Sequence, residues 1–261
     1  MRSLSIGATG MLAQQLNVDV ISNNIANMST TGFKRQRAEF QDLLYQSMRR
    51  VGTASSDAGT IVPAGVQIGA GVQSASVYRI HQQGNMEVTD NALDLAINGR
   101  GFFQVELPSG ETAYTRAGSF LLDAQGRIVT ADGYTVVGPN TVPDNALQIA
   151  VNESGEVSVT LDGQVDPQVV GQFQLANFAN ETGLEAIGNN LYLETPASGE
   201  AVTGTPQSEG FGQIEQGMLE TSNVNIVSEI TNLIAAQRAY EMNSKVITTT
   251  DEMMRTTTSL R

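Results

Sequence analysis

The stretch LIAAQRAYEMNSKVITTTDEM, residues 233–253, decides how this chain is expected to fold. Its apolar side chains recur at helical spacing, so it predicts an amphipathic α-helix. Polar residues interrupt the same stripe at Gln237, Ser244 and Asp251. A helix with such a mixed stripe needs a packing partner, and the other end of the sequence offers one.

Both ends of the chain carry a heptad stripe. Apolar side chains seven residues apart are Leu4, Met11, Val18 and Ile25 near the start, and Ile226, Leu233, Tyr240, Ile247 and Met254 near the end, where Ile230 takes an interleaved position. This repeat is typical of coiled coils. We therefore expect a helix over residues 3–27 and another from about residue 224 onward, which pack together within or between subunits and form the assembly interface.

Polar residues recur inside both stripes, at Gln15, Ser22, Gln237 and Ser244. A polar side chain in a coiled-coil seam lowers stability but disfavours wrong registers, so we predict that these four set the register. Glycines in the first stretch each destabilise a helix by about 1 kcal/mol, so we expect the ends to order on assembly. The alternative is that each amphipathic helix lies on its own domain.

The middle of the chain, residues 85–220, has a different pattern. FLLDAQGRIVTADGYTVVG and LQIAVNESGEVSVTLDG each alternate apolar and polar residues between Gly-containing turns. Short strands at this spacing predict an antiparallel β domain of sandwich or barrel type. The fold class is therefore α+β, with terminal helices in a coiled coil and a central, mainly antiparallel β domain.

The region between the first helix and the β domain is less regular. We expect a second, shorter helix over residues 35–50, because Phe40, Leu43, Leu44 and Met48 fall on one side of a helix. Residues 51–84 predict an extended connection with short strands near residues 66–68 and 76–80. A disordered linker is the alternative for its Gly-, Ala- and Ser-rich part, residues 51–76.

Few residues could support catalysis. The 261-residue chain has no cysteine and one histidine, His81, which excludes thiolate chemistry and a two-histidine metal site. We interpret His81 as an ordinary polar position in an extended segment. Glycine pairs lack the spacing of nucleotide loops, and carboxylate pairs such as Asp90 and Asp94 are typical of turns. The sequence predicts no enzyme, no cofactor and no metal.

Charge is concentrated in the middle. Residues 101–225 carry sixteen acidic but two basic side chains, which argues against nucleic-acid binding. One basic cluster, Lys34, Arg35 and Arg37, is interpreted as a solvated helix face or as a salt-bridge partner for another subunit rather than as a phosphate site. The start of the chain lacks the apolar core of a cleaved signal peptide, so we expect export by another route.

Three segments of the sequence resemble the bacterial flagellar rod and hook proteins. They are ANMSTTGFKRQRAEFQDLLYQ (26–46), NALDLAINGRGFFQVELPSGETAYTRAGSF (91–120) and GMLETSNVNIVSEITNLIAAQRAYEMNSKVITTTDEM (217–253). The similarity spans essentially the whole chain. It implies a structural subunit of the distal rod, a rigid hollow helical shaft that transmits torque through the periplasm to the hook.

The same resemblance implies a set of partners and a location. The partners are further copies of the chain, proximal rod subunits, hook and hook-junction subunits, the ring proteins of the peptidoglycan layer and outer membrane, and the flagellar type III export apparatus. The location is the rod of the basal body, from the periplasm to the outer membrane. The resemblance also gives residues 46–66 a role in stiffening the rod.

The expected division of the chain combines both lines of reasoning. Residues 1–50 and 221–261 form the helical core, residues 51–84 the connection and residues 85–220 the outer β domain. Two alternatives remain: a proximal rod or hook subunit of the same family, and a secreted β-rich module that binds cell-wall glycan.

Overall fold

The computed structural model describes residues 2–49, 64–143, 145–161 and 166–259. The chain divides into two compact units. Unit 1 holds the described parts of Met1–Ile25, Gln36–Tyr78 and Asn225–Arg261, and unit 2 holds Ala26–Arg35 and the described parts of Arg79–Val224. The predicted α+β class is confirmed, since one helix stands at each end of a mainly antiparallel β region.

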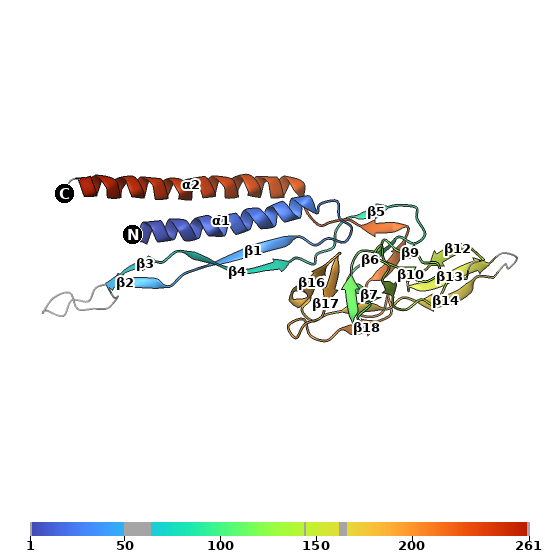
Figure 1. Cartoon of the computed structure of the whole chain (residues 1–261). Coiled ribbons are helices and arrows are strands. Elements are labelled where there is room, and N and C mark those ends of the chain that lie inside the picture. Colours follow the sequence, from blue (N-terminus) through green and yellow to red (C-terminus); the bar gives the residue numbers. More distant parts are fainter. Residues whose placement is uncertain (1, 50–63, 144, 162–165, 260–261) are drawn as a thin grey trace. The chain divides into compact units, whose positions relative to one another are not determined.

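Unit 1 contains both long helices, α1 (Arg2–Ala26) and α2 (Ile226–Ser259) (Figure 1). The turn-rich residues that follow α1 end it, and the Thr30 N–H bonds back to the Asn27 carbonyl. α2 begins after Asn225, whose Oδ1 accepts the Ser228 N–H at 3.1 Å as an N-cap. The two predicted terminal helices are thus confirmed. Within the described residues no helix is long and apolar enough to span a membrane.

The two helices run antiparallel and touch along one side. A Cβ atom added at Gly7 would lie 3.0 Å from Ile247 Cγ1, and one at Gly10 would lie 2.8 Å from Asn243 Nδ2. Near the other end of α1, Asn24 Nδ2 donates to Glu229 Oε2 at 3.3 Å. Small or polar residues of α1 therefore occupy these contacts.

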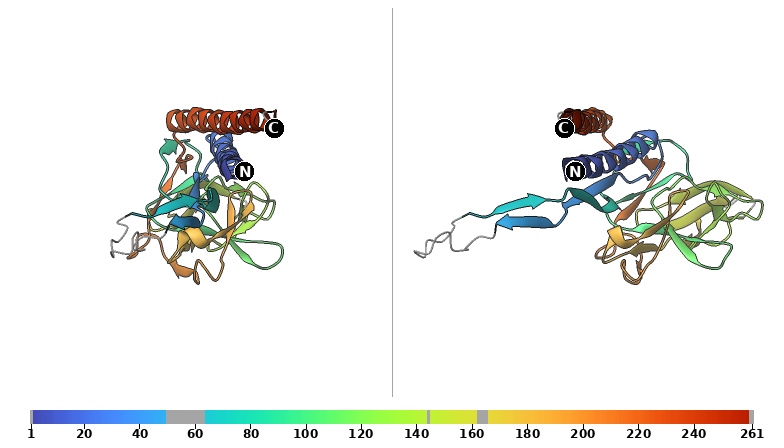
Figure 2. Two further views of the ribbon diagram at one scale, coloured as in Figure 1. Left: turned by 90° about the vertical axis from the view of Figure 1, so that its left-hand side faces the viewer. Right: turned by 60° about the vertical axis from the view of Figure 1, so that its left-hand side comes forward.

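The helix predicted over residues 35–50 is wrong. These residues form two strands, β1 (Gln36–Asp42) and β2 (Tyr45–Arg49), which pair with β4 (Val72–Arg79) and β3 (Val66–Gly69), respectively. Figure 2 shows this ribbon of strands alongside α1. The predicted strands near residues 66–68 and 76–80 are present, and their unpaired backbone groups need partners. Pairing with β3 and β4 therefore overrides the helical spacing.

Unit 2 contains the remaining strands, which form antiparallel ladders. The largest sheet consists of β7 (Phe102–Glu106), β8 (Thr112–Thr115), β9 (Leu121–Leu122), β10 (Ile128–Val129), β11 (Thr135–Val136), β15 (Leu175–Asn177), β16 (Glu185–Gly188), β17 (Leu191–Leu193) and β18 (Val202–Gly204). A second sheet is β12 (Ala146–Val151), β13 (Glu156–Leu161) and β14 (Gln168–Gln172). Two further pairs join β6 (Leu95–Asn98) to β19 (Gln213–Gln216), and β5 (Met86–Val88) to β20 (Met218–Glu220).

Four hairpin turns of unit 2 share one design, over residues 107–111, 123–127, 130–134 and 152–156. In each turn the fourth residue is a glycine, and its N–H donates to the carbonyl of the first residue. The N–H of the first residue donates to the carbonyl of the fifth residue. These glycines have positive φ angles: Gly110, Gly126, Gly133 and Gly155. A three-residue loop with glycine in this conformation is a favoured hairpin connection. The Gly-containing turns predicted within the two alternating stretches are therefore confirmed at residues 123–127, 130–134 and 152–156, whereas the Asp162–Gly163 part of the second stretch lies outside the described residues.

The hydrophobic core of unit 2 contains side chains from several of its sheets. Its main cluster contains Leu95, Ile97, Phe103, Phe120, Ile128, Val136, Val151, Val157, Phe173, Leu175 and Ile214. Each such side chain stabilises the fold by about 1.5–3 kcal/mol. Because residues of the predicted β region supply this whole cluster, the unit has enough apolar material to fold around its own core.

Candidate functional site

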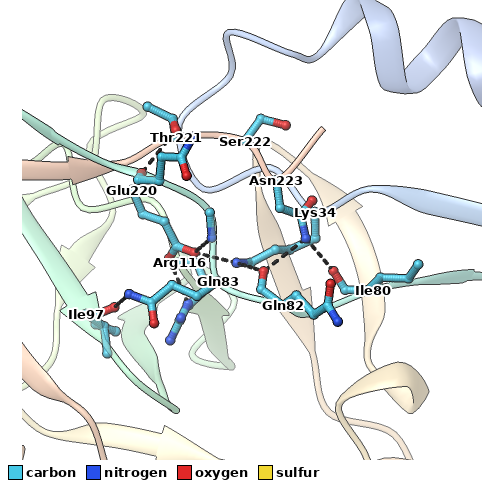
Figure 3. A network of polar contacts seen from close by, with 12 residues as sticks. Lys34, Ile80, Gln82, Gln83, Ile97, Arg116, Glu220, Thr221, Ser222 and Asn223 are labelled. Atoms are coloured by element: carbon cyan, nitrogen blue, oxygen red, sulfur yellow. Dashed lines mark hydrogen bonds and ion pairs between the residues drawn. The ribbon is translucent and has the colours of Figure 1, made fainter. Parts of the chain in front are cut away.

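A buried carboxylate, Glu220 at the end of β20, is the centre of a network of polar contacts (Figure 3). Glu220 Oε1 accepts hydrogen bonds from Lys34 Nζ at 2.6 Å and from the Gly84 N–H at 2.7 Å. Its Oε2 accepts one from Arg116 Nε at 3.0 Å. We call Lys34, Gln82, Gly84, Arg116, Glu220 and Asn223 the polar junction.

Both cations of the junction are almost fully buried. Lys34 is 1% exposed and Arg116 is 5% exposed. Lys34 Nζ also donates to the Gln82 carbonyl at 2.9 Å, and Arg116 Nη1 donates to the carbonyls of Gly99 and Gly101. Burial lowers the pKa of Lys34, partly offset by the attraction of Glu220. Their donors are thus used to bind carbonyls as well as the carboxylate.

The junction joins segments that are far apart in the sequence. Asn223 Nδ2 donates to the carbonyls of Ile80 and Gln82, and its Oδ1 accepts the Arg35 N–H at 2.7 Å. The Gly32 N–H donates to the Glu220 backbone carbonyl at 2.8 Å. Residues 26–35, which follow α1, are therefore fixed to residues 79–85 and to residues 217–224, which precede α2.

Close backbone approach is part of this arrangement. A Cβ atom at Gly84 would lie 1.9 Å from the Thr221 carbonyl oxygen, so only glycine fits there without a backbone shift. The Thr221 N–H donates to the Asn85 carbonyl at 2.8 Å beside it. The glycine thus lets two crossing segments pack directly against each other.

This arrangement is suited to holding segments together rather than to catalysis. The carboxylate of Glu220 is shared by two cations and one backbone N–H, which leaves it no role as a free base. Within the described residues no group of three or more His, Asp or Glu side chains could hold a metal ion. The junction is therefore a structural site.

His81 lies beside the junction in an aromatic setting. Its ring packs edge-on against Phe102 at 5.7 Å and Tyr192 at 5.6 Å between centroids. Burial, together with the nearby charges of Lys34, Arg79 and Arg116, lowers the pKa of His81 to about 4. The residue interpreted as an ordinary polar position is thus a partly buried, neutral imidazole.

The residues predicted to form the assembly interface differ in exposure. Half-buried positions are Leu4, Met11, Val18, Ile25, Leu233, Ser244 and Ile247. Exposed positions are Gln15, Ser22, Ile226, Ile230, Gln237, Tyr240 and Met254. Of these, Ile247 lies at the contact between α1 and α2. Two further contacts between the helices join Gly10 to Asn243 and Asn24 to Glu229. The role of the predicted set in assembly stays a prediction.

The polar junction is not indicated by the sequence pattern. Lys34 was interpreted as part of a solvated face or as a partner for another subunit, and the structure corrects this, since Lys34 is buried and pairs with Glu220 of the same chain. The helix predicted over residues 35–50 favoured a solvated position. The available signal was the position of Lys34 directly after the Thr30–Phe33 turn, before the predicted helix begins.

Three models of known protein families together match most of the chain. Residues 4–34 match the family model described as flagella basal body rod protein, residues 96–159 that of the flagellar hook protein FlgE/F/G D1 domain, and residues 215–260 that of the flagellar basal body rod FlgEFG protein C-terminal region. Lys34, Arg116 and Glu220 fall in the three matches, one in each.

Individual proteins resemble the chain over nearly its full length. The flagellar basal-body rod protein FlgG of Caulobacter vibrioides is 62% identical over 100% of both chains. The FlgG protein of Agrobacterium fabrum is 53% identical over 97% of both chains. The flagellar basal-body rod protein FlgF of Caulobacter vibrioides is 35% identical over 97% of this chain and 95% of its own length.

Proposed function

The chain belongs to the family of flagellar basal-body rod proteins, and we propose that many copies of it build the distal rod as a rigid hollow shaft that carries torque to the hook. Proteins of this family are structural, so the chain is a structural subunit of the rod and not an enzyme. The higher identity to FlgG than to FlgF favours the distal rod over a proximal position. Nothing in the comparisons supports a cell-wall-binding module.

The observation that carries the proposal is the apolar surface left on α2. Val227 is 76% exposed and Met242 is 68% exposed, and further large apolar side chains are open along the helix: Ile226, Ile230, Ile234, Tyr240, Val246, Met253 and Met254. Apolar patches of this kind are typical of protein–protein interfaces. Contact with neighbouring subunits would remove these side chains from water, which stabilises the assembly by about 25 cal/mol per Å² of apolar surface buried.

The terminal helices are proposed to form the coiled-coil core of the shaft. The contact between α1 and α2 within one chain uses small and polar residues at Gly7, Gly10 and Asn24. The half-buried stripe of Leu4, Met11, Val18 and Ile25 remains beside it and can meet other subunits. Gln15, Ser22, Gln237 and Ser244 would then set the register, because each must find a polar partner when it is buried.

Each part of the chain has a proposed position relative to this core. Residues 1–50 and 221–261 would supply the inner core, residues 51–84 the connection and residues 85–220 the outward β domain. The segment proposed to stiffen the rod, residues 46–66, lies mostly outside the described residues. The sixteen acidic and two basic side chains of residues 101–225 would keep the outer surface hydrated against surrounding rings.

The proposed location is the rod in the periplasm, reached through the type III export apparatus. The proposed neighbours are proximal rod subunits, hook and hook-junction subunits, and the ring proteins of the peptidoglycan layer and outer membrane. This placement is supported by the family membership of the chain.

The experiment that tests the assembly role is electron microscopy of the concentrated full-length protein. We expect straight tubes from the unmodified chain and none from Leu233→Asp, because a charge at a half-buried helix position opposes burial. The matched control is Ser228→Asp, which adds the same charge at an exposed position in the first turn of α2. Normal tubes from Leu233→Asp, with the control also normal, would refute the role of this stripe.

A further inference from the structure

The environment of His81 combines burial with an unused polar atom. His81 Nδ1 is buried and has no hydrogen-bond partner among the described residues. Two aromatic rings, Phe102 and Tyr192, pack edge-on against its ring. A charged imidazole donates through both nitrogens, so protonation would leave a buried N–H without an acceptor at this position.

The charges that face His81 add to this effect. Lys34 and Arg116 come from the polar junction, and Arg79 lies two residues away, with its Cζ 5.7 Å from the centroid of the Tyr192 ring. The carboxylate of Glu220 attracts a charge on His81, but it already binds both Lys34 and Arg116. A proton on His81 would therefore bring a third cation close to a carboxylate that already binds two.

We propose that His81 is a proton-operated switch whose protonation loosens the polar junction between residues 26–35, residues 79–85 and residues 217–224. The repulsion acts on Lys34 and Arg116, the two cations that bind Glu220. When these contacts open, Gly32, Arg35 and Gly84 lose acceptors that belong to residues 220 and 223. The segments next to α1 and α2 are then no longer fixed to the β core of unit 2.

The direction of the pH effect follows from proton binding in the two states. His81 has a pKa of about 4 in the folded chain, against 6.5 for an unperturbed histidine. Between these values the unfolded chain holds more protons, so stability is present above pH 6.5 and is lost as the pH falls toward 4. From pH 7.5 to pH 5, the folding constant should fall about 30-fold through this residue alone.

The first test is an NMR titration of the full-length protein, in which the sole histidine gives one unambiguous ring signal. The expected midpoint lies near pH 4. A midpoint near 6.5 in the folded protein would overturn the proposal, because His81 would then carry its charge without penalty.

The second test compares urea unfolding of the unmodified chain and of His81→Phe at pH 7.5 and pH 5. Carboxylates titrate in both proteins, so the difference isolates His81. We expect the unmodified chain to lose about 30-fold more in its folding constant than the variant does. Equal losses would overturn the proposal, and His81→Gln replaces the Phe variant if that protein does not fold.

The third measurement tests whether protonation of His81 opens the polar junction locally. Hydrogen exchange at the amides of Gly32, Arg35 and Gly84 should accelerate between pH 7.5 and pH 5, after correction for intrinsic rates, in the unmodified chain but not in the variant. Val157, in the β core, is the internal reference and should stay protected. Acceleration that is uniform over the chain would mean that His81 reports global unfolding and would refute a local switch.

Discussion

Lys34 and Glu220 are separated by 186 residues in the sequence, yet Lys34 Nζ lies 2.6 Å from Glu220 Oε1. Their side chains are 1% and 0% exposed. Arg116 binds the other oxygen of the same carboxylate at 3.0 Å. This pair therefore joins the segment after α1 to the segment before α2, inside a site that water does not reach.

Removing the charge of Glu220 should strongly destabilise unit 2. In Glu220→Gln, two buried cations lose their carboxylate, and breaking a buried pair in this way costs about 3–5 kcal/mol. Urea unfolding of the full chain would measure this loss of stability. The control, Glu209→Gln, removes the same charge at an exposed position and should change stability by less than about 0.5 kcal/mol. Similar values for the two variants would contradict the central role of Glu220.

Replacement of Lys34 should be milder than replacement of Glu220. In Lys34→Met, Glu220 keeps Arg116 and the Gly84 N–H, and the burial of the ammonium group is relieved. We expect a loss of about 1–2 kcal/mol at pH 7.5, measured by urea unfolding. A loss as large as that of Glu220→Gln would show that Lys34, and not the carboxylate, dominates the junction.

The lowered pKa of Lys34 predicts that the stability of the folded chain depends on pH above neutrality. Burial lowers its pKa below 10.5 in the folded chain, so between that lowered value and 10.5 the unfolded chain holds more protons. The unmodified protein should therefore gain stability relative to Lys34→Met as the pH rises toward 10. Unfolding of both proteins at pH 7.5, 9 and 10 measures this, and a relative loss would reverse the sign we assign.

Gly84 should not tolerate a side chain. In Gly84→Ala the new Cβ would lie 1.9 Å from the Thr221 carbonyl oxygen, so the backbone must shift and the Gly84 N–H is drawn away from Glu220. We expect a loss of more than about 3 kcal/mol, measured by thermal or urea unfolding. Gly133→Ala, at a positive φ with open space around it, should cost about 1 kcal/mol. Equal costs would mean that the crossing at Gly84 is not tight.

Two neighbouring residues of α1 should separate folding from assembly. Asn24 is buried, and its side chain exchanges hydrogen bonds with the backbone of Gln36, so Asn24→Ala should lower stability by about 1–3 kcal/mol. Ser22 is exposed, so Ser22→Ala should leave the stability of the single chain unchanged but allow tubes of mixed register. Unfolding and electron microscopy of both variants check this. A large stability loss in Ser22→Ala would contradict the proposed role.

Much of the fold could be predicted because it depends on local periodicity. The heptad stripes predicted both terminal helices, and the glycines of the hairpins predicted turns that have a positive φ angle at Gly126, Gly133 and Gly155. The lack of cysteine and the single histidine already excluded thiolate chemistry and a two-histidine metal site. These properties are set by residues within a few positions of one another, and no distant contact is needed to recognise them.

The remaining features depend on which segments meet. Residues 36–49 have helical spacing, but β3 and β4 supply backbone partners, and so the segment is extended. Lys34 has the sequence context of a surface cation, but it is buried because Glu220 and Arg116 reach it from distant parts of the chain. The sequence by itself therefore determined the two terminal helices and the glycine turns, and it predicted a structural protein rather than an enzyme. Only the tertiary structure decided which polar groups lose contact with water, because desolvation depends on contacts between segments that the local pattern does not encode.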